Sequence, residues 1–323
     1  MTELKMGILG TSEIAFRRFL PALKKAENWE YAGVASRELA KTEKFVQEFG
    51  GKGYGSYEEL LAEGEIDAVY LPLPPVLHFE WARKALENGK HVFLEKPSTI
   101  SYEQTKMLVE LASEKGLALR ENYMFTEHPQ LTVIQKLIAE GNIGELRLIR
   151  IAFGFPRREG NDFRYDRALG GGALLDCGGY TVKLANLLLG EDVKCQYANL
   201  NRDCLSDVDL YGWAVLENQK KQAAQISFGM DNSYKCELEI WGQKGSIKSP
   251  RIFTAGPELE VVLEVEEKGE KKLLPVPAAD QFYGSILRFE SCIESQEQRT
   301  VEYQELLRQA RLVEAVQLQG QER

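Results

Sequence analysis

The chain has 323 residues, enough for two domains of ordinary size, and its composition is that of a globular protein. A net charge of −9 argues against nucleic acid as the main partner, and no apolar run is long enough to span a bilayer. The five cysteines are scattered and odd in number, and the three histidines are dispersed, so no disulfide framework or metal site is predicted. No segment resembles a signal peptide, and we expect a cytoplasmic protein.

The first elements predict a dinucleotide site. A short apolar strand at 5–9 runs directly into Gly10, and a helix with one apolar face follows. This is the context of the fingerprint G-x-G-x-x-G/A, in which the start of a helix meets a pyrophosphate. Gly10 and Ala15 fit the first and third positions, whereas Ser12 replaces the second glycine. An ordinary strand–helix turn is the alternative. The residues expected to line the turn are Gly10, Thr11, Ser12, Glu13 and Ile14.

The end of the second strand, 31–35, indicates which cofactor is preferred. An NAD site usually has Asp or Glu here, on the ribose 2′-hydroxyl. This chain has Ser36 and Arg37 instead. Arg37 can pair with a 2′-phosphate, and the carboxylate that would repel it is missing. The sequence therefore favours NADP(H), with NAD(H) still possible, although Ser36 could simply cap the next helix.

Later strands of this half end at the same predicted sheet edge. The strand at 66–71 ends in a proline-rich loop, and the last strand, 117–120, leads to Asn122. Alternating strands and helices over residues 1–122 predict a doubly wound, mostly parallel sheet. His78 begins a helix and is more typical of a capping or packing histidine than of a base. The residues assigned here to the cofactor site are Leu71, Pro72, Leu73, His78 and Asn122.

A lysine follows the buried strand predicted at 91–94. Pro97 restricts the backbone of Lys96 and holds it at the carboxyl end of the strand. Ligands of open α/β sheets bind at that edge, and a lysine there could protonate an alkoxide forming on a substrate. Glu95 is assigned to the cofactor site, with Lys96 beside it. A surface Lys-Pro turn is the alternative.

The alternation of strands and helices stops near residue 122. We therefore expect two domains, an NADP-binding Rossmann domain at 1–122 and a substrate-binding and oligomerisation domain at 123–323. From 193 to 276 strands follow one another with short turns, which predicts an α+β domain on a mostly antiparallel open sheet. In the segment 210–216, the residues that would point to either face of the strand are apolar, so both faces are expected to be covered. Helices can cover one face and a second subunit the other, so we expect a homodimer or homotetramer.

An irregular segment, 155–169, is rich in arginine and aromatic residues, as a substrate loop would be. Its arginines favour an anionic substrate such as a nucleotide-sugar, whereas a solvated basic loop is the alternative. Arg164 and Tyr165 are assigned to substrate binding.

The glycine-rich helix that follows places Asp176 and Tyr180 on one face, with Lys183 close to the same stripe. Gly178 and Gly179 each cost roughly 1 kcal/mol in a helix, so either a ligand or another helix is expected to approach closely. Tyr180 can donate to a carbonyl oxygen, and Asp176 can anchor a hydroxyl. A kinked helix packed on the sheet, with Asp176 as a local cap, is the alternative.

Three motifs, at 7–15, 95–97 and 171–180, have the order and spacing of the Gfo/Idh/MocA oxidoreductase family, which the whole chain resembles. The amino-acid sequence at 16–23, 70–74 and 122–130 is similar to that of NDP-sugar 3-ketoreductases of deoxysugar biosynthesis. The resemblance implies that Lys96 and Tyr180 flank the reacting carbon beside the nicotinamide, with Asp176 on the substrate side. Two departures are Ser12 and Lys183. Lys183 replaces a common acidic residue and disfavours an inositol-type polyol.

The sequence thus predicts an NADP(H)-dependent oxidoreductase that transfers a hydride between nicotinamide and a carbonyl or hydroxyl carbon of a sugar-like substrate. An NDP-keto-sugar 3-reductase is its most specific form. A dihydrodiol or aldose dehydrogenase acting on a free small molecule is one alternative. A non-catalytic dinucleotide-binding sensor is another, against which Lys96, Asp176 and Tyr180 argue.

Overall fold

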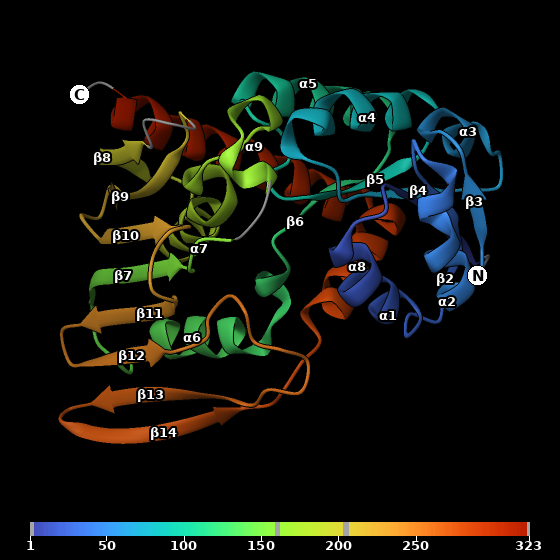
Figure 1. The fold of residues 1–323 in the computed structure, drawn as a ribbon. Helices are drawn as coiled ribbons and strands as arrows, with labels where there is room; N and C mark the ends of the chain where they lie inside the picture. Colours follow the sequence, from blue (N-terminus) through green and yellow to red (C-terminus); the bar gives the residue numbers. More distant parts are fainter. Residues whose placement is uncertain (1–2, 159–161, 203–206, 322–323) are drawn as a thin grey trace. The chain divides into compact units, whose positions relative to one another are not determined.

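The computed structural model describes residues 3–158, 162–202 and 207–321. They form two compact units. One contains the chain up to Asn122 together with Phe282–Ala310, and the other contains Tyr123–Gln281 together with the residues from Arg311 onward. Each unit is built on its own β-sheet (Figure 1).

The sheet of the first unit has six parallel strands in the order β3-β2-β1-β4-β5-β6. This confirms the predicted doubly wound sheet. The strand order reverses beside β1, and such a switch point is where ligands bind at the carboxyl ends of the strands. The three-residue β3 was not predicted. The strands are β1 Leu4–Leu9, β2 Trp29–Ala35, β3 Lys52–Tyr54, β4 Ala68–Leu71, β5 His91–Glu95 and β6 Leu119–Asn122.

Helices cover both faces of this sheet, because alternate residues of each buried strand point to opposite sides. Val69 and Val92 face a cluster that includes residues of α4 and α5, whereas Tyr70 and Phe93 pack with Phe19 on the other face. The serine before α3 and the serine before α5 each cap their helix. The helices are α1 Leu20–Leu23, α2 Glu43–Phe49, α3 Tyr57–Ala62, α4 Pro75–Glu87 and α5 Tyr102–Lys115; residues 13–23 are continuously helical, with a π-helical turn over Ala15–Phe19.

The helix α8 (Gln281–Glu294) and the first part of α9 (Gln296–Gln321) belong to the first unit. Phe289 stacks on both Trp29 and Phe93, and Glu290 accepts a hydrogen bond from the Trp29 indole at 3.0 Å. The predicted domain boundary after residue 122 therefore misses one feature of the structure: residues 282–310 belong to the first unit and not to the second. The amphipathic pattern of a helix shows that one side is buried but not which sheet it covers.

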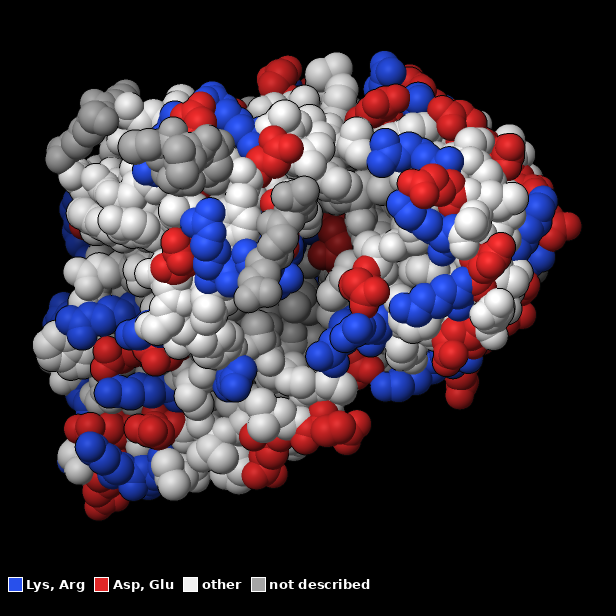
Figure 2. All heavy atoms as spheres, in the orientation of Figure 1, with Lys and Arg blue, Asp and Glu red and all other residues white. Residues whose placement is uncertain are grey.

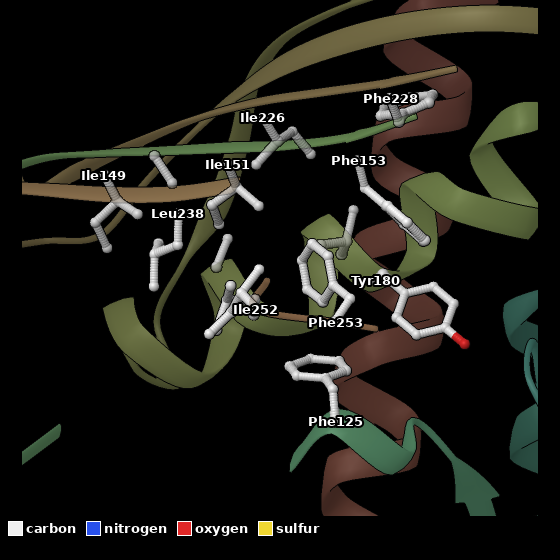
Figure 3. Packing of buried hydrophobic residues seen from close by; sticks show 14 of the residues in the cluster. Phe125, Ile149, Ile151, Phe153, Tyr180, Ile226, Phe228, Leu238, Ile252 and Phe253 are labelled. Atoms are coloured by element: carbon white, nitrogen blue, oxygen red, sulfur yellow. The ribbon is translucent and has the colours of Figure 1, made fainter. Parts of the chain in front are cut away.

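The second unit has an eight-stranded sheet in the order β14-β13-β12-β11-β7-β10-β9-β8. All neighbours are antiparallel except β7 and β10, which confirms the mostly antiparallel sheet. Its core contains Ile151, Phe228 and Leu238 on one face (Figure 3). The strands are β7 Leu146–Gly154, β8 Lys194–Arg202, β9 Asp209–Glu217, β10 Ala223–Gly229, β11 Lys235–Gly242, β12 Gly245–Ser249, β13 Val261–Glu267 and β14 Glu270–Val276; the helices are α6 Pro129–Ala139 and α7 Gly179–Leu189.

Within the described residues, no helix is long and apolar enough to cross a membrane, and no group of three His, Cys, Asp or Glu side chains could hold a metal ion. Cys177, Cys195, Cys236 and Cys292 form no disulfide with one another, and Cys204 lies outside the described residues.

A buried ion pair fastens α9 to β6, and we predict that it contributes strongly to stability. Arg120 donates to Glu302 at 2.5 Å, and both side chains are about 95% buried, with exposed fractions of 5% and 4%. Glu302→Gln removes the charge that compensates Arg120, so the free energy of unfolding in urea should fall by about 3–5 kcal/mol. The control is Glu140→Gln, which removes the exposed pair with Lys136 and should cost less than about 1 kcal/mol. Equal, small losses in both variants would contradict this account of how α9 is held.

Candidate active site

The turn after β1 has a conformation and surroundings that require glycine. Gly10 has φ +112°, and a Cβ there would lie 2.7 Å from a methyl carbon of Leu73. Its N–H donates to Ala35 O at 3.0 Å, which ties the turn to the end of β2. The Ser12 hydroxyl accepts from Ala15 N at 3.2 Å, so the serine that replaces the second fingerprint glycine caps the helix. Glu13 is exposed and pairs with Arg17.

The end of β2 suits a 2′-phosphate. Ser36 is buried, and its hydroxyl accepts from Glu38 N at 3.3 Å, so the turn-capping role considered for it is present. Arg37 is exposed beside it. The nearest acidic residue along the chain, Glu38, is paired with Lys41 at 2.7 Å. The site therefore offers a guanidinium where an NAD site would offer a carboxylate.

His78 joins two loops at the sheet edge. Its ring is fully buried, with Nδ1 2.8 Å from Pro97 O and Nε2 2.7 Å from Leu73 O. Burial lowers the pKa of His78, against the opposing effect of the carbonyl contacts. Both polar atoms are thus directed at backbone, and His78 supports the loops after β4 and β5.

A hydrogen-bond network joins the ends of three strands. The Glu95 carboxylate accepts from Tyr70 Oη at 2.6 Å and from Asn122 Nδ2 at 2.7 Å, both through Oε1. Asn122 Oδ1 in turn accepts from Ser285 of α8 at 2.8 Å. Burial raises the pKa of Glu95, although these hydrogen bonds oppose the shift. Lys96 follows directly and forms a cis peptide bond with Pro97.

Sequence reasoning missed Tyr70 as part of this network. A tyrosine in a buried aliphatic strand was the available signal, because a buried phenol usually needs a hydrogen-bond partner.

The second unit carries the predicted glycine-rich helix, which opens with a π-helical turn over Leu174–Gly178 and continues as α7. π-Helical turns are frequent at functional sites. Asp209 fixes the start of this helix, since its carboxylate accepts from Leu174 N at 2.6 Å. A Cβ on Gly172, which has φ +123°, would overlap that carboxylate. Burial raises the pKa of Asp209, and its role was not predicted from the sequence.

The two glycines of the helix are needed for packing with side chains. A Cβ on Gly179 would overlap the Tyr123 hydroxyl, and one on Gly178 would lie 3.1 Å from the Phe228 ring. The sequence predicted a close approach by a ligand or another helix. Within the second unit, the groups that approach are instead these side chains, from a 3₁₀ turn region and from β10.

Tyr180 lies in an aromatic cage. The rings of Tyr123, Phe153, Phe253 and Phe125 have centroids 5.1, 5.2, 5.6 and 5.8 Å from its own. Its hydroxyl points away from Phe125 and Phe253 (Figure 3) and contacts Met124 Sδ at 3.5 Å. The cage fixes the direction of the ring, and only 7% of the residue is exposed. Tyr180 is therefore a rigidly held hydrogen-bond donor.

Asp176, four residues earlier, is held by Arg164. The guanidinium donates to Asp176 at 2.8 Å and to Asp162 at 3.1 Å. Burial would lower the pKa of Arg164, but the two carboxylates more than offset it and raise the pKa. Arg164 thus orients Asp176 within the unit, and the assignment of Arg164 to substrate binding stays a prediction. Lys183 is buried on the same helix.

The remaining predicted substrate-loop residues have partners within the unit. The Tyr165 hydroxyl accepts from Arg158 N at 3.0 Å and donates to Met230 O at 2.8 Å. Arg157 pairs with Asp231, and Arg167 pairs with Asp207. These contacts anchor the described part of 155–169; residues 159–161 lie outside the described chain.

The first unit gathers the predicted cofactor residues at the carboxyl edge of a parallel sheet, which defines the class of dinucleotide-binding α/β proteins. A model of an oxidoreductase family with an NAD-binding Rossmann fold matches residues 4–123, and one of the GFO/IDH/MocA C-terminal domain matches 132–248. The chain belongs to the Gfo/Idh/MocA oxidoreductase family, as its resemblance predicted.

Several relatives are similar over almost the whole chain. A dTDP-3,4-didehydro-2,6-dideoxy-alpha-D-glucose 3-reductase of Actinomadura kijaniata is 39% identical, over 97% of this chain and 94% of its own. The protein of that name from Saccharopolyspora spinosa is 40% identical, over 88% and 86%. The crystal structure of KijD10, a 3-ketoreductase from A. kijaniata in complex with NADP and TDP-benzene, superposes with a TM-score of 0.94 at 37% identity, over 98% of both chains.

We predict that the cost of Gly179→Ala depends on the Tyr123 hydroxyl. In the wild-type background the new Cβ meets that oxygen, and unfolding free energy should fall by about 1–3 kcal/mol. In a Tyr123→Phe background the oxygen is absent, and alanine should be neutral or stabilising because it favours the helix by roughly 1 kcal/mol. Urea unfolding of the four proteins gives the coupling. Equal effects in both backgrounds would show that something else requires glycine here.

Proposed function

We propose that this protein is an NADP(H)-dependent oxidoreductase that reduces the 3-keto group of a nucleotide-linked deoxysugar. The observation that carries the proposal is the presence of Lys96 directly after β5 and of caged Tyr180 in α7, in a chain similar over nearly its full length to 3-ketoreductases. The guanidinium at the end of β2 supports NADP(H) over NAD(H).

In the proposed mechanism, Lys96, Tyr180 and Asp176 have separate roles in the reduction of the ketone. Bound NADPH supplies a hydride to the carbonyl carbon. Lys96 donates a proton to the carbonyl oxygen, and Tyr180 hydrogen-bonds that oxygen as its negative charge develops. Asp176, oriented by Arg164, anchors a substrate hydroxyl. The hydride and the proton together convert the ketone into an alcohol.

The residues present fit the cofactor. Gly10 leaves its turn without a side chain, the helical segment 13–23 begins directly after it, and no acidic residue occupies position 36 or 37. In this proposal, Gly10 to Ser12 face the pyrophosphate, and Ser36 with Arg37 binds the 2′-phosphate. Glu95, supported by Tyr70 and Asn122, keeps Lys96 at the nicotinamide end.

We predict that Lys96→Ala loses turnover and retains cofactor. The wild-type protein should oxidise NADPH with a dTDP-linked 3-keto-deoxysugar, and Lys96→Ala should lower kcat by about 10²-fold or more, the usual effect of losing a general acid. The Kd for NADPH, from cofactor fluorescence, should change less than about threefold. Lys115→Ala, at the exposed end of α5, is the matched control. Near-normal turnover would remove Lys96 from the mechanism. Activity only on free aldoses or dihydrodiols would contradict the nucleotide-sugar assignment and leave the oxidoreductase.

The uncovered face of the second sheet supports a homo-oligomer. Tyr211, Trp213 and Trp241 are 47%, 42% and 59% exposed on strands of this sheet. Charged side chains of both signs alternate over the region of β11 to β14 (Figure 2), and a hollow of about 830 Å³ is lined there by residues such as Arg150, Glu239 and Lys248. A face with aromatic groups and paired charges can meet a second copy of itself in a two-fold arrangement.

The oligomer prediction is tested by mass in solution. The wild-type chain should be a dimer or tetramer at micromolar concentration by light scattering, and Trp213→Glu with Trp241→Glu should shift it to monomer by placing two charges in the interface. Leu318→Glu, at an exposed position of α9, serves as the control and should leave the mass unchanged. A wild-type monomer at this concentration is the result that excludes the proposed assembly.

A further inference from the structure

The segment that follows Lys96 and Pro97 is anchored to α5 by hydroxyl groups. Ser98 and Thr99 are both buried. The Thr105 hydroxyl of α5 lies 3.1 Å from the Ser98 hydroxyl and 2.8 Å from the Thr99 hydroxyl. The segment therefore packs against a helix, and its side chains have fixed places.

The peptide group between Pro97 and Ser98 is held on both of its sides. Its N–H, which belongs to Ser98, donates to the Glu121 carboxylate at 2.6 Å. Its carbonyl, which belongs to Pro97, accepts from His78 Nδ1 at 2.8 Å. Glu121 is only 6% exposed and His78 is fully buried, so water does not readily replace either partner. Because the peptide is planar, a partner on each side prevents the whole group from rotating.

Glu121 is one of two neighbouring residues of β6 that hold the chain around Lys96. Successive side chains of a strand point to opposite faces of the sheet. Asn122 donates to Glu95, directly before the lysine, at 2.7 Å. Glu121 accepts from Ser98, two residues after the lysine. Strand β6 is the direct neighbour of β5, and it therefore fixes the chain on both sides of Lys96.

The position of the lysine backbone matters for the proposed chemistry. A general acid has to lie within hydrogen-bond reach of the oxygen that it protonates. The side chain of lysine is long and flexible, so where its ammonium group can reach depends on a backbone that stays in place. A misplacement of about 1 Å in a catalytic group can lower a rate about 10²-fold.

We propose that Glu121 is a positioning residue for Lys96. By holding the Ser98 N–H, opposite His78 on the same peptide, it keeps the lysine backbone in place for protonation of the substrate carbonyl oxygen. This rests on the proposed function, because it takes Lys96 as the general acid. The hydrogen bond needs an acceptor oxygen and not a negative charge, so glutamine can replace Glu121 and alanine cannot.

The first measurement follows the Ser98 N–H itself and needs no substrate. Hydrogen exchange of fragments that contain Ser98 is measured by mass spectrometry on the full-length protein, and it should be slow in the wild type. Glu121→Ala removes the acceptor, so exchange there should become at least about tenfold faster. Glu121→Gln keeps an acceptor oxygen and should stay within about threefold of the wild type.

The second measurement is oxidation of NADPH with a dTDP-linked 3-keto-deoxysugar. The kcat is counted per NADPH-binding site, so that unfolded protein does not contribute. Glu121→Ala should lower kcat about tenfold or more, but less than Lys96→Ala does, because the lysine is displaced and not lost. The KM for the sugar and the Kd for NADPH should change less than about threefold, and Glu121→Gln should restore kcat to within about threefold of the wild type. Glu121→Met, which fills the space without an acceptor oxygen, replaces the alanine variant if that variant does not fold.

Glu290→Ala is the matched control. Glu290 is another buried carboxylate of the first unit, 8% exposed, and it accepts from Asn28 Nδ2 at 2.6 Å and from Trp29 Nε1 at 3.0 Å. Trp29 is the first residue of β2, so these partners lie at the opposite edge of the parallel sheet from Lys96. Glu290→Ala should lower stability in urea, as Glu121→Ala does. It should leave kcat per binding site and exchange at Ser98 within about twofold of the wild type.

Three results would overturn the inference and leave the proposed function intact. They are unchanged kcat per binding site in Glu121→Ala, a loss in Glu121→Gln as large as that in Glu121→Ala, and an equal loss in Glu290→Ala. The second would assign the effect to the charge of Glu121, and the third to general destabilisation. If the wild type bound NADPH but reduced no keto-sugar, the proposed function would fail and the inference with it, even if exchange at Ser98 followed the expected order.

Discussion

The Glu95 carboxylate is the group on which the arrangement of the first unit most depends. It accepts hydrogen bonds from Tyr70 of β4 and Asn122 of β6, and Asn122 connects it to Ser285 of α8. One side chain thus fixes the carboxyl ends of three neighbouring strands and a helix from the far end of the sequence. A buried carboxyl group is costly at such a place unless donors satisfy it, and two donors do so here. Lys96 takes its position from this network because it is the next residue.

The second unit reaches the same rigidity by packing. Four aromatic rings hold Tyr180, and Asp209 holds the start of its helix. Gly179 allows the Tyr123 hydroxyl to approach the helix backbone, so the helix and the cage are built together. Arg164 adds the orientation of Asp176. A hydrogen-bond donor that does not need to reorganise is most effective where charge develops during a reaction, and Tyr180 has that role in the proposed mechanism.

Periodicity and turn residues predicted the Rossmann sheet, the antiparallel sheet and most helices, because these depend on local order along the chain. The positions of Gly10, Arg37, Lys96 and Asn122 at one edge also followed, since parallel strands share their carboxyl ends. The partner of Arg164, the cap from Asp209 and the placement of α8 did not follow. Each depends on a contact between residues distant in sequence. No local pattern specifies which carboxylate an arginine or a helix start will contact, or which sheet a helix will cover.

The measurement that tests the account most directly is a titration of the wild-type protein with NADPH and with NADH at the same ionic strength. The exposed Arg37 guanidinium lies at the end of β2, where the 2′-phosphate of NADP(H) is proposed to bind. We therefore expect NADPH to bind at least about tenfold more tightly than NADH, and added salt to reduce this difference by screening the exposed guanidinium. Equal affinities, or tighter binding of NADH, would contradict the central assignment of the end of β2.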